Sequence, residues 1–101
     1  METTIIEEKD KQAIITLKGR LDTSVATEVQ EAIAPLYEKD LERVVIDCKE
    51  LEYIASSGLR IFFLLLRTMK PKGVDVVVKD ASEMLKNVFH STGFDALLKF
   101  E

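Results

Sequence analysis

The chain has 101 residues, 47% of them hydrophobic, which suits one domain with one core. Its 14 basic and 18 acidic residues give a net charge of −4 and form no basic stretch, which argues against nucleic-acid binding. The amino terminus lacks the pattern of a secretory signal, and the longest apolar run, Ile61 to Leu66, is far shorter than the roughly 20 residues that cross a bilayer. We therefore expect one domain over residues 1–101, cytoplasmic and without membrane insertion.

The chain begins with two short β-rich stretches, Thr4 to Glu7 and Ala13 to Leu17. The charged residues Glu8 to Lys11 between them predict a hairpin turn, so the two strands should pair antiparallel. The stretch from Gly19 to Ser24 then breaks the strand pattern. It ends in Asp, Thr and Ser, which are typical residues for capping a following helix.

A helix is predicted next, from about Ser24 to Lys39. Its apolar residues recur at helical spacing and predict one buried stripe: Val25, Val29, Ile33 and Leu36. Because an interior proline removes a backbone hydrogen bond, we expect the helix to kink or end near Pro35. The β-branched run within Arg43 to Asp47 then predicts a buried strand.

The stretch from Ala55 to Gly58, at the centre of the segment Val44 to Met69, carries the only plausible chemical handle of the chain. It precedes a leucine-rich segment ending at Met69, which predicts a helix buried almost all round. Ser56 or Ser57 is predicted to cap this helix. A helix N-terminus also favours an anion, so a phosphate on Ser56 would add about −1.5 to −2 charges without refolding the domain. The simpler interpretation is that the two serines are only a cap and a turn.

The last third of the chain repeats the strand and helix pattern. Pro71 to Gly73 predicts a helix stop, and Val74 to Val78 predicts a strand. Asp80, with Glu83 at capping-box spacing, is predicted to cap a helix that ends at Gly93. The residues expected to face the core from this helix are Met84, Leu85, Val88 and Phe89.

A final strand is predicted over Ala96 to Phe100, which completes the order β-β-α-β-α-β-α-β. This order indicates an α/β domain with a mixed sheet of about five strands, antiparallel at its start and parallel after it. Functional groups in such sheets gather at the carboxyl ends of strands. The loops predicted over Gly19 to Ser24 and Glu50 to Gly58 follow the second and third strands, so Asp22, Thr23, Ser56 and Ser57 are expected to share one edge.

Several classes of enzyme are excluded by missing motifs. Neither G-x-x-x-x-G-K-[ST] nor G-x-G-x-x-G occurs, and a G-x-S-x-G elbow is absent as well. His90 is the one histidine, and the sequence places no second histidine or cysteine at the spacing of a metal site, while Cys48 fits a small buried core residue. We therefore predict no catalytic residues, metal or cofactor, so that any modification of Ser56 requires another enzyme.

Four elements in this order resemble the STAS domain, and most closely the bacterial anti-sigma-factor antagonists. They are Gly19 to Asp22, Val44 to Leu51, Ile54 to Leu59 and Ser91 to Phe94, and the resemblance covers essentially the whole chain. It implies a switch in which the unphosphorylated antagonist binds an anti-sigma factor that is also a serine kinase, and so frees a sigma factor. The kinase then phosphorylates and releases the antagonist, and a PP2C-type phosphatase removes the phosphate.

The phosphorylated serine of the family matches Ser56, and the aspartate beside it matches Asp22. The chain departs from the family at Ala55, where many members carry an acidic residue. We expect a partner surface formed by Arg20, Asp22, Thr23, Ser56, Ser57 and Arg60. Arg60 could meet a phosphate or a partner carboxylate, or simply be solvated. Two alternatives stay open: a constitutive STAS scaffold subunit of a transporter or signalling assembly, and a small enzyme or ligand carrier.

Overall fold

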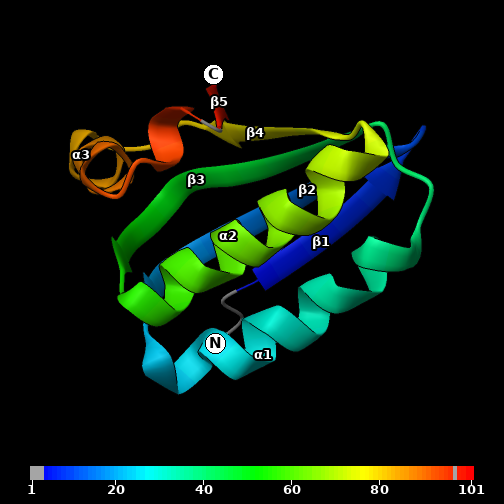
Figure 1. Ribbon diagram of the computed structural model, residues 1–101. Coiled ribbons are helices and arrows are strands. Elements are labelled where there is room, and N and C mark those ends of the chain that lie inside the picture. The colour runs from blue at the N-terminus through cyan, green and yellow to red at the C-terminus, as the bar shows by residue number, and fades with distance from the viewer. Residues whose placement is uncertain (1–3, 97) are drawn as a thin grey trace.

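A five-stranded mixed sheet forms the centre of the computed structural model, which describes residues 4–96 and 98–101 (Figure 1). Its strands lie in sequence order: β1 (Thr4–Lys9), β2 (Gln12–Leu21), β3 (Arg43–Ile54), β4 (Asp75–Lys79) and β5 (Lys99–Phe100). β1 pairs antiparallel with β2, and every later pairing is parallel. The predicted α/β class, element order and mixed sheet are confirmed.

The turn between β1 and β2 is tighter than the sequence suggested. It consists of Asp10 and Lys11, whose φ angles are 52° and 62°. Two consecutive residues with positive φ are typical of the two-residue hairpin turn whose twist matches that of the strands. The predicted hairpin is confirmed, but Glu8 and Lys9 belong to the first strand rather than to the turn.

Two helices, α1 (Thr23–Ile33) and α2 (Ser56–Met69), lie side by side on one face of the sheet (Figure 1). α1 ends just before Pro35, and a 3-10 helix, η1 (Ala34–Glu38), continues the chain, as the proline predicted. A second 3-10 helix, η2 (Lys70–Lys72), follows α2, and its C-cap is Gly73, whose φ is 78°. The core lies between these helices and the sheet, and its fully buried side chains include Ile15, Leu17, Val29, Phe62 and Leu65.

The prediction that the second helix is buried almost all round is wrong. Ser56, Arg60, Phe63 and Arg67 are exposed along it, while Phe62 and five other residues of α2 are buried. The sequence does not reveal the exposed face, because Phe63 lies within the long apolar run and yet is 43% exposed.

The third helix is α3 (Glu83–Ser91), and its N-cap is Ser82. The prediction that Asp80 caps it is wrong. The Ser82 hydroxyl accepts a hydrogen bond from the Leu85 amide at 3.2 Å. Because the helix begins at Glu83, its phase leaves Met84 49% exposed, whereas Leu85 and Phe89 are buried as expected. The Phe62 and Phe89 rings, 5.2 Å apart, join α3 to the main core.

The last predicted strand is shorter than expected. Ala96 belongs to a 3-10 helix, η3 (Phe94–Ala96), and β5 has only two residues, Lys99 and Phe100. Leu97 lies outside the described residues. No helix in the part of the chain that the structure describes is long and apolar enough to cross a membrane.

The two segments predicted as functional loops are mostly strand. The ends of β2 and β3 pair in parallel, with Gly19 opposite Leu51 and Leu21 opposite Ile54, and β2 and β3 shift register twice along this pairing. Leu21, Leu51 and Ile54 are all buried, so the pairing carries core side chains to the edge of the sheet. The loop before α2 is therefore reduced to Ala55.

Candidate functional site

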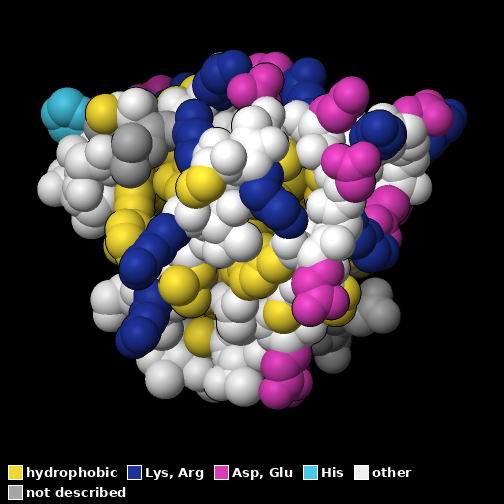
Figure 2. Space-filling model, turned by 45° about the vertical axis from the view of Figure 1, so that its right-hand side comes forward, with side chains coloured by type: hydrophobic (Ala, Val, Ile, Leu, Met, Phe, Trp, Pro, Cys, Tyr) yellow, Lys and Arg dark blue, Asp and Glu magenta, His cyan; other side chains and the backbone are white. Residues whose placement is uncertain are grey.

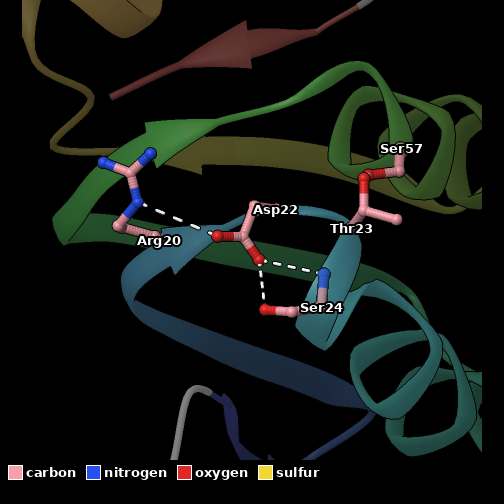
Figure 3. Close-up of polar contacts among 5 residues, drawn as sticks. All are labelled: Arg20, Asp22, Thr23, Ser24 and Ser57. Atoms are coloured by element: carbon pink, nitrogen blue, oxygen red, sulfur yellow. Dashed lines mark hydrogen bonds and ion pairs between the residues drawn. The ribbon is translucent and has the colours of Figure 1, made fainter.

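The carboxyl ends of β2 and β3 meet the N-termini of α1 and α2 at one edge of the sheet. On this edge the Arg20 guanidinium lies 4.3 Å from the centre of the Tyr53 ring, a distance typical of a cation–π contact. The Arg20 Nε atom also lies 3.8 Å from a carboxylate oxygen of Asp22 (Figure 3). These two contacts fix Arg20 at the rim of the site.

Asp22 is the N-cap of α1. Its carboxylate accepts hydrogen bonds from the Ser24 amide at 3.0 Å and from the Ser24 hydroxyl at 2.5 Å (Figure 3). The Ser24 hydroxyl is the main cause that holds the pKa of Asp22 below its ordinary value of 3.8, with the Arg20 charge adding to it against partial burial. Asp22 is thus an ionised carboxylate whose hydrogen bonds go to the first turn of its own helix.

α2 begins at Ser56, but the prediction that Ser56 or Ser57 caps it is wrong. The N-cap is Ala55, and the described residues provide no side-chain hydrogen bond to this helix end. The reason is that the Ala55 amide donates to the Leu21 carbonyl at 2.9 Å, which fixes the end of β3 and makes Ser56 the first helical residue. The backbone N–H groups of the first turn consequently remain open to an acceptor.

The two serines differ in their surroundings. Ser57 is half-buried, and its hydroxyl lies 3.4 Å from the Thr23 hydroxyl, which joins the start of α2 to the start of α1 (Figure 3). Ser56 is exposed, and its hydroxyl bonds to none of the described residues. Of the two, Ser56 is the more exposed residue.

Gly58 is the residue of this edge whose role was missed in the sequence. A Cβ atom at this position would lie 2.7 Å from Leu21 Cγ and 2.9 Å from Ile54 Cγ1. Only glycine therefore lets the first turn of α2 approach the ends of β2 and β3 this closely. The Ser-Ser-Gly order could have suggested such a close approach, but only the folded chain identifies the two side chains involved.

Arg60 lies one turn after Ser56 on α2 and is exposed. It borders a hollow of about 270 Å³ between α1 and α2, together with Ser57, Ile61 and Leu64 from the same helix. Arg60 forms no ion pair with any described residue, so its charge is available to a ligand. The predicted site residues thus fall into two groups. Arg20, Asp22, Thr23, Ser56 and Ser57 lie at the sheet edge, and Arg60 borders the hollow between α1 and α2.

The possible metal ligands of the described residues are not clustered, and the one cysteine is buried. Within the described ranges, no group of three or more His, Cys, Asp or Glu side chains is placed to hold a metal ion. Cys48 is buried in β3, where burial and, to a smaller degree, the charge of Asp47 raise its pKa to about 12. Its thiol is therefore protonated and acts as a core side chain.

Comparisons with known proteins agree on one family and one fold. A family model described as the STAS domain matches residues 3–101. The putative anti-sigma factor antagonist BtrV of Bordetella bronchiseptica is 28% identical over 85 residues, or 84% of this chain and 73% of that protein. The anti-sigma-B factor antagonist of Listeria monocytogenes is 27% identical over 97 residues, which cover 95% of this chain and 85% of that protein. Unphosphorylated SpoIIAA, an anti-sigma factor antagonist of known structure, has the same fold, with a TM-score of 0.84 and 16% sequence identity. The match covers 97% of this chain and 87% of that one.

Proposed function

The chain belongs to the STAS domain family, and from that premise we propose that it is an anti-sigma factor antagonist. In this proposal the unphosphorylated chain binds an anti-sigma factor that is also a serine kinase, and a sigma factor is freed. The kinase phosphorylates Ser56 and releases the chain, and a PP2C-type phosphatase restores it. The names of the curated relatives support the regulatory role.

The observation that carries the proposal is the accessibility of Ser56. It is the first residue of α2, it is exposed, and no side chain among the described residues caps that helix end. A phosphate there would meet open N–H donors and the positive end of the helix dipole, so the fold would accept it. The added −1.5 to −2 charges would instead change the surface that a partner meets.

The partner surface that we propose consists of Ser56 together with Arg20, Asp22, Thr23, Ser57 and Arg60. Within it, Arg20 and Arg60 present cations, whereas Asp22 and Ser57 hold the two helix ends in place. A small energetic effect is enough for a switch, because a loss of about 1.4 kcal/mol weakens binding tenfold. One phosphate at the centre of such a surface can therefore release a partner.

The test is a pull-down from lysate of the native host with wild-type, Ser56→Ala and Ser56→Asp baits, followed by mass spectrometry. We expect wild type and Ser56→Ala to capture an ATP-binding anti-sigma kinase that Ser56→Asp does not retain. Ser91→Asp is the matched control, since it adds the same charge at an exposed serine of α3. Capture of the same partners by all baits would contradict the switch and indicate the constitutive scaffold instead.

A further inference from the structure

The exposed side chains of α2 fall on one line. Ser56, Arg60, Phe63 and Arg67 are the exposed residues of this helix, and Lys70 continues their spacing into η2. Residues three and four apart are neighbours on a helix surface, so these five form a continuous strip, which we call the α2 stripe. The serine of the proposed switch is the first residue of this stripe.

The α2 stripe is positively charged although the whole chain is acidic. Residues 56–72 contain four cations, Arg60, Arg67, Lys70 and Lys72, and no Asp or Glu. The Lys72 side chain donates to the Tyr37 carbonyl, but the side chains of Arg60, Arg67 and Lys70 form no ion pair or hydrogen bond with any described residue. No described carboxylate pairs directly with these three side chains, although Glu31 of α1 lines the same hollow as Arg60.

An apolar anchor point lies between these cations. Phe63 is 43% exposed, and its ring lies 6.2 Å from that of Phe94. Beside it is a hollow of about 250 Å³ lined by Phe63, Leu66, Arg67, Lys70 and Pro71. Figure 2 shows dark-blue Lys and Arg side chains lying next to yellow hydrophobic ones on this side of the molecule. An exposed aromatic ring beside a hollow with cationic edges is typical of an anchor in a protein interface.

We propose that the α2 stripe binds an acidic amphipathic helix of a protein partner. Arg60 and Arg67 are seven residues apart, about 10 Å along the helix axis at 1.5 Å per residue. Carboxylates seven residues apart on a partner helix would face both guanidinium groups, which are well suited to bind them. An apolar side chain between those carboxylates would contact Phe63 and the hollow beside it, as in other complexes in which a helix lies in a groove.

The neighbouring helix favours a narrow acidic ligand over an anionic membrane. Residues 23–38, which form α1 and η1, contain Glu28, Glu31 and Glu38 and no Lys or Arg. In Figure 2 most of the magenta Asp and Glu side chains lie on the right-hand side, away from the dark-blue group at the lower left. A flat membrane surface would meet both helices and be repelled by the glutamates. A single helix about 10 Å wide can lie on α2 alone.

The stripe also links docking to the switch, and this part rests on the proposed function. A phosphate on Ser56 would lie one helical turn from Arg60 and add negative charge at the end of the stripe. It would compete with the partner for Arg60 and repel the partner's carboxylates. Phosphorylation would thereby weaken the same contact that the unphosphorylated chain makes.

The test uses a synthetic helical peptide of about 18 residues with glutamates at seven-residue spacing and leucines between them, followed by fluorescence anisotropy. We expect the wild-type chain to bind it, and the double variant Arg60→Glu/Arg67→Glu to bind at least tenfold more weakly. The matched control is Lys9→Glu/Lys49→Glu, which makes the same charge change at two exposed lysines of β1 and β3. A peptide with lysine in place of glutamate, and vesicles of phosphatidylcholine and phosphatidylserine, complete the comparison.

The proposal is overturned if the lysine peptide or the vesicles bind as tightly as the glutamate peptide, or if the control loses as much affinity as the stripe variant. It is equally overturned if the wild-type chain does not bind the glutamate peptide. A Ser56→Asp chain separates the two parts: unchanged affinity for the peptide would contradict the link to the switch. Unchanged affinity in Arg60→Glu/Arg67→Glu would contradict the surface itself, whatever the pull-down shows.

Discussion

Neighbouring polar residues at the sheet edge have different roles, which can be distinguished by the contacts that each residue makes. The Asp22 carboxylate is occupied by Ser24 and Arg20, and Ser57 faces Thr23 across the two helix ends. The Ser56 hydroxyl has none of these contacts. We infer that Asp22 contributes chiefly to the stability of α1, whereas Ser56 carries the regulation.

The stability role of Asp22 predicts that Asp22→Ala lowers the free energy of unfolding, because the Ser24 amide at the start of α1 loses its N-cap acceptor. Urea denaturation measures this loss. Asp40→Ala is the control, because Asp40 is 91% exposed and forms only a surface ion pair with Lys11, so its loss should cost little.

The same variant predicts a pH dependence. The pKa of Asp22 is lower in the folded chain than its ordinary value of 3.8, so the carboxylate stabilises the fold at pH values above 3.8. This contribution is lost as the pH falls through the lower, folded-state pKa. The difference in unfolding free energy between wild type and Asp22→Ala should therefore be constant down to about pH 4 and shrink below it. A difference that persists undiminished in acid would contradict the assignment.

At the scale of elements, the order of strands and helices was predictable because their apolar periodicity is strong. The ends of β2 and β3 were not, since Lys49, Glu50 and Glu52 suggest a charged loop in the sequence although their backbone is paired. That pairing joins residues about 30 positions apart, and no local pattern reports it. The same limit hid Gly58, whose close neighbours Leu21 and Ile54 come from the two strands.

The close approach at Gly58 predicts the sign of a substitution. Glycine to alanine within a helix ordinarily stabilises by about 1 kcal/mol. Here the new Cβ atom would lie 2.7 Å from Leu21 Cγ, and such overpacking costs about 1–3 kcal/mol, so Gly58→Ala should have a net destabilising effect. Thermal and urea denaturation measure it.

The partner of that contact provides the control. In the double variant Leu21→Ala/Gly58→Ala, the clash with Leu21 is removed and only the one with Ile54 remains, so the added cost of Gly58→Ala should be smaller than in the wild-type background. A stabilising Gly58→Ala, or equal costs in the two backgrounds, would contradict the close packing of α2 against β2.

At the scale of the whole molecule, the fold places an acidic and a basic segment of the chain next to each other. The acidic residues of α1 and η1 and the basic residues of α2 and η2 lie on adjacent helices over one face of the sheet (Figure 1). The edge that gathers Asp22, Thr23 and Ser57 follows from strand order and could be predicted. The α2 stripe could not be predicted. Apolar residues of α2 lie on its exposed face as well as on its buried face, so the sequence does not show which residues face the solvent. Under the two proposals, the domain combines a modifiable serine with an oriented, charged docking face.

The most direct test of the central claim is a calorimetric titration of the purified anti-sigma kinase with the chain unphosphorylated and with phosphoserine encoded at position 56. We predict a Kd at least tenfold weaker for the chain phosphorylated at Ser56, and no such change with phosphoserine at position 91 on α3. Equal Kd values for the unphosphorylated chain and the chain phosphorylated at Ser56 would contradict the account and leave Ser56 as the first residue of a helix and nothing more.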